Sequence, residues 1–200
     1  MSALPKPKKL TVAEYLVLEA KADYRSEFFN GEMFAMAGSS PEHNEIKDNL
    51  IAELALALRG SGCRTYSSDQ RIKVDRTGLY TYPDVVIVCG KKEVDAADPN
   101  SITNPKVVVE ILSPSTASYD RGTKFRHYQR VSSVHEIVLV SQDRVQVERF
   151  VRHPDESWTL TTFDDPTGDF SLASLGIRVR LGEVYRDVEL PEAPLRATES

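Results

Sequence analysis

The stretch VVVEIL, residues 107–112, constrains the fold more than any other part of the chain. Five of its six residues are valine, isoleucine or leucine, as in a strand that is buried on both faces. Glu110 lies in the middle of this run, where an unpaired carboxylate would be costly or would take up a proton. The sequence therefore predicts a central strand whose glutamate has a positively charged partner.

Neighbouring segments predict the rest of a core around this strand. Residues 82–89 (YPDVVIVC) and 135–141 (HEIVLVS) are further short apolar strands. Thr11 and Glu14 have the spacing of a capping box, so a short helix begins there. A longer helix follows Ser40-Pro41, and another begins near Asp120, after a loop at residues 113–120. This order predicts an α/β or α+β fold with a central mixed sheet flanked by helices.

Two additions to this core are expected. Asn30-Gly31 between two alternating runs indicates an N-terminal β-hairpin, in which Phe29 pairs with Glu32 and Glu27 with Phe34. Residues 144–151 and 157–163 alternate as half-exposed antiparallel strands do. We expect one domain over residues 1–200, with loose tails at 1–9 and 190–200.

Composition narrows the class of protein. The net charge of -5 argues mildly against a protein that coats nucleic acid, but allows a metal-dependent acidic site in a local groove. No apolar run approaches the roughly 20 residues of a membrane span, and the N-terminus lacks the apolar stretch of a secretory signal. We expect Cys63 and Cys89 to be reduced structural thiols of a cytoplasmic protein.

Three residues together suggest a site. Asp84 opens an apolar strand directly after a proline, Glu110 lies inside the next strand, and Lys124 follows on the next helix. Helical spacing turns Lys124 the same way as Asp120 and Tyr128. Two acids and a lysine suit a divalent cation such as Mg²⁺ with a phosphate or an attacking water. The alternative for Glu110 is a plain ion pair with a buried arginine or lysine.

At these residues the chain resembles the PD-(D/E)XK restriction-endonuclease-like superfamily. The run from Glu110 through Ser113-Pro114-Ser115-Thr116 to Lys124 is similar to that of a widespread bacterial family of proposed restriction endonucleases. The resemblance covers roughly residues 10–184. It implies a nuclease core, DNA as substrate, and Mg²⁺ or Mn²⁺ as cofactor. Asp84 matches the motif aspartate and Glu110 the motif acid.

The resemblance also exposes a departure. The motif lysine belongs two residues after Glu110, where this chain has Leu112. Related families move this lysine to the following helix, which makes Lys124 its substitute. If Lys124 does not reach the metal-binding acids, catalysis is in question.

Two further residues are candidates for the site. His43 falls on the apolar stripe at the N-terminal end of a helix, a place that favours anions, or it is simply a core histidine with a partner. Glu32, just after the hairpin turn, is a candidate for an additional acid, although an exposed hairpin residue is the alternative. For Glu27 we prefer the exposed position.

The sequence thus predicts an endonuclease that binds one or two Mg²⁺ or Mn²⁺ ions through Asp84 and Glu110, with Lys124, Glu32 and His43 completing the pocket. Cutting both strands of DNA usually takes paired sites, so we expect a homodimer. The other hypothesis is a catalytically silent member of the fold that binds nucleic acid or a protein. A hydrolase acting on another phosphate ester is a third.

Overall fold

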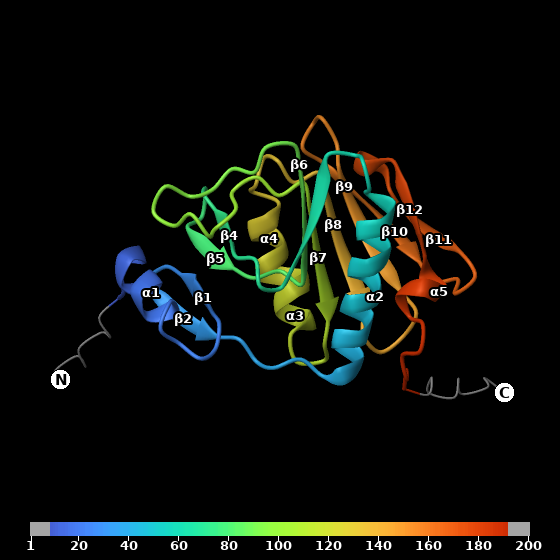
Figure 1. The fold of residues 1–200 in the computed structure, drawn as a ribbon, viewed down its shortest axis with the longest axis horizontal. Helices are drawn as coiled ribbons and strands as arrows, with labels where there is room; N and C mark the ends of the chain where they lie inside the picture. The colour runs from blue at the N-terminus through green and yellow to red at the C-terminus, as the bar shows by residue number, and fades with distance from the viewer. Residues whose placement is uncertain (1–8, 192–200) are drawn as a thin grey trace.

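The computed structural model describes residues 9–191, and the predicted tails lie mostly outside them. Helices and strands alternate along the chain much as the sequence predicts (Figure 1). The helices are α1 Val12–Glu19, α2 Pro41–Ala57, α3 Ala117–Tyr119, α4 Phe125–Tyr128 and α5 Leu181–Val184, with a π-helical turn Asp120–Lys124 and a 3₁₀ turn Ala173–Leu175. The strands are β1 Ser26–Phe29, β2 Glu32–Ala35, β3 Cys63–Ser67, β4 Ile72–Val74, β5 Leu79–Thr81, β6 Val85–Cys89, β7 Val107–Leu112, β8 Glu136–Ser141, β9 Val147–Arg152, β10 Trp158–Phe163, β11 Asp169–Leu172 and β12 Ile177–Arg180.

A six-stranded sheet forms the centre of the fold, in the order β10-β9-β8-β7-β6-β3. Strands β7 and β8 are parallel, and their neighbours pair antiparallel, so the sheet is mixed as predicted. The alternating C-terminal strands β9 and β10 extend this sheet at one edge, and β11 with β12 forms a separate hairpin. The prediction of an α+β fold with a central mixed sheet is confirmed.

Helices cover both faces of the sheet because β7 alternates its apolar side chains between them (Figure 1). On one face, Val109 and Ile111 pack in the same core as Leu50 of α2. On the other face, Val108 and Leu112 share a core with Tyr128 of α4. By this alternation Glu110 points to the α4 side, into an otherwise apolar layer.

The N-terminal hairpin joins a second, four-stranded sheet in the order β2-β1-β5-β4. Asn30 and Gly31 have φ of 51° and 85°, the left-handed conformations that a tight hairpin turn of this type needs. The predicted register holds, with Phe29 opposite Glu32 and Glu27 opposite Phe34. Strand β1 lies inside this sheet and β2 forms its edge, so the two arms of the hairpin have very different environments.

A buried arginine connects α1 with the loops that flank β6. The Arg71 guanidinium donates to Asp98 Oδ2 at 2.6 Å and to the Tyr82 hydroxyl at 2.9 Å. Tyr82 in turn donates to Glu19 at the end of α1, at 2.8 Å. Because Tyr82 lies two residues before Asp84, this network links the N-terminal helix to the segment that presents the predicted aspartate.

Two local predictions are wrong. Cys63 and Cys89, expected as reduced thiols, face each other across β3 and β6 and form a disulfide, so the thiols no longer argue for a reducing compartment. The helix expected from Asp120 already begins at Ala117 and passes through the π-helical turn.

Of the residues that the structure describes, none belongs to a helix long and apolar enough to cross a membrane.

The Arg71–Asp98 pair makes stability depend on pH. Burial alone raises the pKa of Asp98, but hydrogen bonds from Ser101 and Arg71 hold it below the usual 3.8. The pair therefore stabilises the fold fully above that pH and loses its effect as pH falls through the lower folded-state value. We expect Asp98→Asn to lower the free energy of unfolding by about 3–5 kcal/mol near neutral pH, because Arg71 loses its partner charge. In urea unfolding, the gap to wild type should shrink as the pH falls below the usual 3.8 and through the lower folded-state pKa; a constant gap would contradict this.

Candidate active site

The strand pairing brings the two predicted acids together. Asp84 directly precedes β6, and Val85 at the start of β6 lies opposite Val109 of β7. Asp84 Oδ2 accepts a hydrogen bond from the backbone N–H of Ile111 at 2.8 Å, the residue after Glu110. The pairing of two neighbouring strands, rather than closeness in sequence, therefore creates an acidic site.

Lys124 reaches into this site from the π-helical turn. Its ammonium nitrogen lies 2.9 Å from Glu110 Oε1, 3.2 Å from Glu27 Oε1 and 3.7 Å from Asp120 Oδ1. The side chain is nearly inaccessible, at 4% relative exposure. Tyr128, one turn further on, donates its hydroxyl to the same Glu110 oxygen. The side chain of Lys124 thus folds over Glu110. Although it stands on the following helix, this lysine does reach the acid of the motif.

Acidic side chains surround Lys124 in this site. The charges of Asp120 and Asp84 act on Glu110, and those of Asp84 and Glu27 act on Asp120. Burial raises the pKa of Glu110 to about 8, although Lys124 lowers it, and the charges of Asp120 and Asp84 add to the rise. Burial lowers the pKa of Lys124, but the surrounding acids, Glu110 foremost, raise it well above its usual value. The lysine is therefore held charged, while burial favours a protonated Glu110 at neutral pH and a bound cation would favour its ionised form.

His43 contacts the motif aspartate. Ser40 caps α2 and accepts from the backbone N–H of His43, which fixes the start of the helix. The ring is 7% exposed, and its Nε2 lies 2.9 Å from Asp84 Oδ1. The core-histidine interpretation and the functional one therefore converge, because the partner that the buried ring finds is Asp84.

The acid that the hairpin contributes to the site is Glu27 of β1, and not Glu32 of β2. Glu32 is exposed on the edge strand β2, and within the described part of the chain its side chain makes no hydrogen bond or ion pair. Glu27, for which the exposed position was preferred, is instead 6% exposed. It accepts hydrogen bonds from Thr81 and, at 2.7 Å, from Tyr119, besides its contact with Lys124. This correction follows from the tertiary position of β1 between β2 and β5.

The donor chemistry fits a divalent cation. Carboxylate oxygens suit Mg²⁺ and Mn²⁺, and a cation would favour the ionised form of Glu110 that burial disfavours. Asp84 and Glu110, with the Ile111 carbonyl nearby in sequence, are the residues that could hold it. Both Asp84 oxygens have protein partners, however, and within residues 9–191 no three His, Cys, Asp or Glu side chains are already arranged around one metal position.

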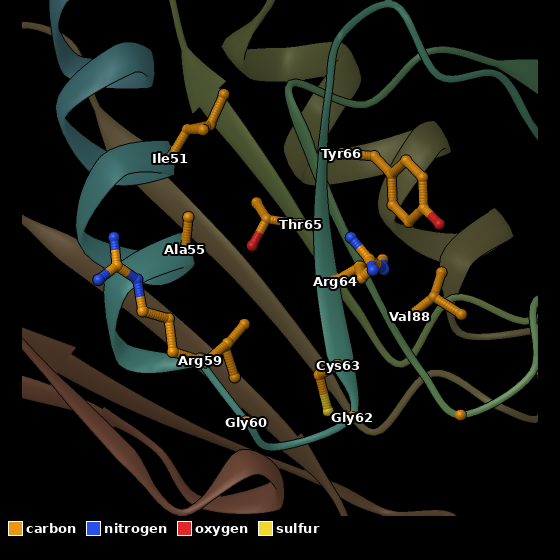
Figure 2. A pocket seen from close by; sticks show the side chains of 12 residues that line it. Ile51, Ala55, Arg59, Gly60, Gly62, Cys63, Arg64, Thr65, Tyr66 and Val88 are labelled. Atoms are coloured by element: carbon orange, nitrogen blue, oxygen red, sulfur yellow. The ribbon is translucent and has the colours of Figure 1, made fainter.

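A cleft opens beside Asp84. It has a volume of about 510 Å³ and is lined by Tyr24, Arg25, Met36 and Ser68 as well as Asp84. A second groove, of about 610 Å³, lies between α2 and the edge strand β3 and includes Arg59, Arg64 and Cys63 (Figure 2). None of the predicted site residues lines this second groove, so the cleft at Asp84 is the one relevant to the acidic cluster.

The fold and the site define a restriction-endonuclease-like protein, and comparison with known proteins agrees. Residues 12–182 match the Uma2 family, described as "Putative restriction endonuclease". A crystal structure of a "putative nuclease belonging to DUF820" from Anabaena variabilis superposes with a TM-score of 0.72, covering 90% of this chain and 98% of that one, at 16% identity. This structural likeness supports the fold.

Two sequence relatives match most of the chain. The Synechocystis sp. protein slr1290 is 34% identical over 178 residues, which is 89% of this chain and 92% of the relative. A second Synechocystis sp. protein, sll1609, is 33% identical over 80% of this chain and 91% of its own length. The chain belongs to the Uma2 family of restriction-endonuclease-like proteins.

The contrast between the two hairpin acids is testable by matched substitutions. Although burial favours its neutral form, Lys124 and hydrogen bonds from Thr81 and Tyr119 hold the pKa of Glu27 below its usual value. The folded state therefore stabilises the ionised carboxylate. We expect Glu27→Gln to lower the free energy of unfolding by about 1–3 kcal/mol near neutral pH. Glu32→Gln should change it by less than about 0.5 kcal/mol. Urea unfolding of both variants measures this, and equal effects would contradict the assignment.

Proposed function

We propose that the protein is a Mg²⁺- or Mn²⁺-dependent endonuclease that hydrolyses phosphodiester bonds in DNA. The observation that carries the proposal is the contact of the Lys124 ammonium with Glu110, whose neighbour Ile111 donates its backbone N–H to Asp84. Lys124 can thus stand in for the motif lysine, whose usual place is taken by Leu112. Family membership and the fold of a nuclease-like relative support the same chemistry.

In this proposal each residue has a distinct role. Asp84 and Glu110 hold the cation, which when bound lowers the pKa of a water and offsets charge on the phosphate. Lys124 orients the attacking water or the scissile phosphate with its ammonium. His43 keeps Asp84 oriented by donating its Nε2–H to Asp84 Oδ1, which leaves Nδ1 as the ring nitrogen that can accept a proton. Glu27 holds the lysine from the opposite side.

The proposal includes a homodimer, since cleavage of both strands of a duplex usually takes two copies of one site. The unpaired edge of β10, where Leu160 is exposed, offers a surface for such contact.

Cleavage assays test the site. Supercoiled plasmid and single-stranded DNA are incubated with Mg²⁺, with Mn²⁺ and with EDTA. We expect cleavage with either metal and none with EDTA. Asp84→Ala, Glu110→Ala and Lys124→Ala should each lower the rate at least about 100-fold, because each removes a group that stabilises charge in the transition state. Glu32→Gln serves as the matched control and should keep wild-type activity. Cleavage that survives all three alanine substitutions would overturn the assignment.

A second candidate function is a silent member of the fold that binds nucleic acid or a protein without cutting. The contacts of Asp84 favour it, because His43 and the Ile111 N–H occupy both carboxylate oxygens and a cation has to displace or share them. The departure at Leu112 and the net charge of -5 point the same way.

Metal binding separates the two candidates. A cation that binds only the folded state raises the midpoint of thermal unfolding, by an amount equivalent to about 2.7 kcal/mol at 100 times its dissociation constant. For the nuclease we expect saturable stabilisation by Mn²⁺ in wild type and in Glu32→Gln, and none in Asp84→Asn. No stabilisation of the wild type at any Mn²⁺ concentration, together with no cleavage, would favour the silent member.

A further inference from the structure

The exposed aromatic side chains gather around the acidic site. Among residues 9–191, the large aromatic side chains exposed to solvent are Tyr24 at 61%, Phe34 at 48% and Tyr119 at 39%. Aromatic rings usually bury a large apolar area, so exposed rings concentrated in one region call for a ligand.

A separate observation places each of the three side chains near the site. Tyr24 lines the cleft that contains Asp84. The Tyr119 hydroxyl donates to Glu27 at 2.7 Å, and its ring is partly exposed above that contact. Phe34 lies directly opposite Glu27 in the β1–β2 register, and opposite residues of an antiparallel pair share one face of the sheet. They come from a loop, a strand and a helix, so no single amphipathic element accounts for them.

The cleft offers few contacts to a phosphate backbone. It is lined by Glu19, Asp23 and Asp84, while Arg25, its one basic residue, is paired with Asp69. Non-specific binding of a duplex depends almost wholly on lysine and arginine contacts to phosphates. A strand with unpaired bases also has such contacts to gain, but its bases can in addition stack on aromatic rings, which the paired bases of a duplex cannot do.

We propose that this site takes single-stranded DNA, or a strand with unpaired bases, which stacks on Tyr24, Phe34 and Tyr119 beside the acidic cluster. The inference rests on the proposed function for the choice of DNA as ligand, and adds the structure of that DNA. The cleft of about 510 Å³ is within the range of pockets that hold a small ligand, and so has room for one base. Tyr119 additionally connects a stacked base to Glu27 and so to Lys124.

The test is a binding measurement that does not need cleavage. Fluorescence anisotropy compares a labelled single-stranded oligonucleotide, a blunt duplex of the same sequence and a duplex with a single-stranded flap, in EDTA and in Ca²⁺. We expect the single strand and the flap to bind at least about 10-fold more tightly than the blunt duplex. Tyr24→Ala and Phe34→Ala should each weaken single-strand binding about 5- to 30-fold.

Leu56→Ala is the matched control, because Leu56 is also exposed, at 57%, but lies near the C-terminal end of α2, about 20 Å along that helix from His43. It should bind as wild type does. Tyr119→Phe keeps the ring and should retain binding, whereas Tyr119→Leu should weaken it. Thermal unfolding of each variant shows that its fold is intact.

The outcomes separate this inference from the proposed function. Equal affinity for duplex and single strand, or aromatic variants that bind like wild type, overturns the inference even if plasmid is cleaved. Preferential single-strand binding that depends on Tyr24 and Phe34 supports it, even if no metal produces cleavage, in which case only the proposed function fails.

Discussion

The assembly of the site depends on the buried contact between Lys124 and Glu110. Burying both groups costs free energy that a single contact does not offset, and burial already raises the pKa of Glu110, so further partners are needed. Glu27 and Asp120 supply them to the ammonium, and Tyr128 supplies one to the carboxylate. These partners come from β1, the π-helical turn, α4 and β7, so the hairpin, the helix and the central strand have to assemble around one charge cluster.

Much of the fold follows from local patterns in the sequence. The apolar runs became β6, β7 and β8, the capping box became α1, and Asn30-Gly31 closed the hairpin in the expected register. These features are local because side-chain period and turn chemistry act over a few residues. The sequence also allowed us to predict that Asp84 lies close to Glu110, because they stand on neighbouring antiparallel strands.

Features that depend on distant partners were not predictable in the same way. Glu27 and Glu32 share one face of the hairpin, yet only Glu27 meets Lys124, because β1 is an inner strand and β2 is an edge. The Cys63–Cys89 disulfide depends on the register between β3 and β6, which no local signal specifies. The π-helical turn at Asp120–Lys124 likewise has no sequence signature that we could have used.

The origin of the lysine matters for how the site forms. A lysine two residues after Glu110 would point to the same face of β7 as Glu110 itself. Leu112 at that place instead completes the apolar core beneath Tyr128, and so helps to dock the helix that carries Lys124. Docking the helix and placing the ammonium are therefore one event. The acids of β6 and β7 gain their cation only when the apolar layer between sheet and helix has closed, so loosening that layer should disturb the site before it unfolds the sheet.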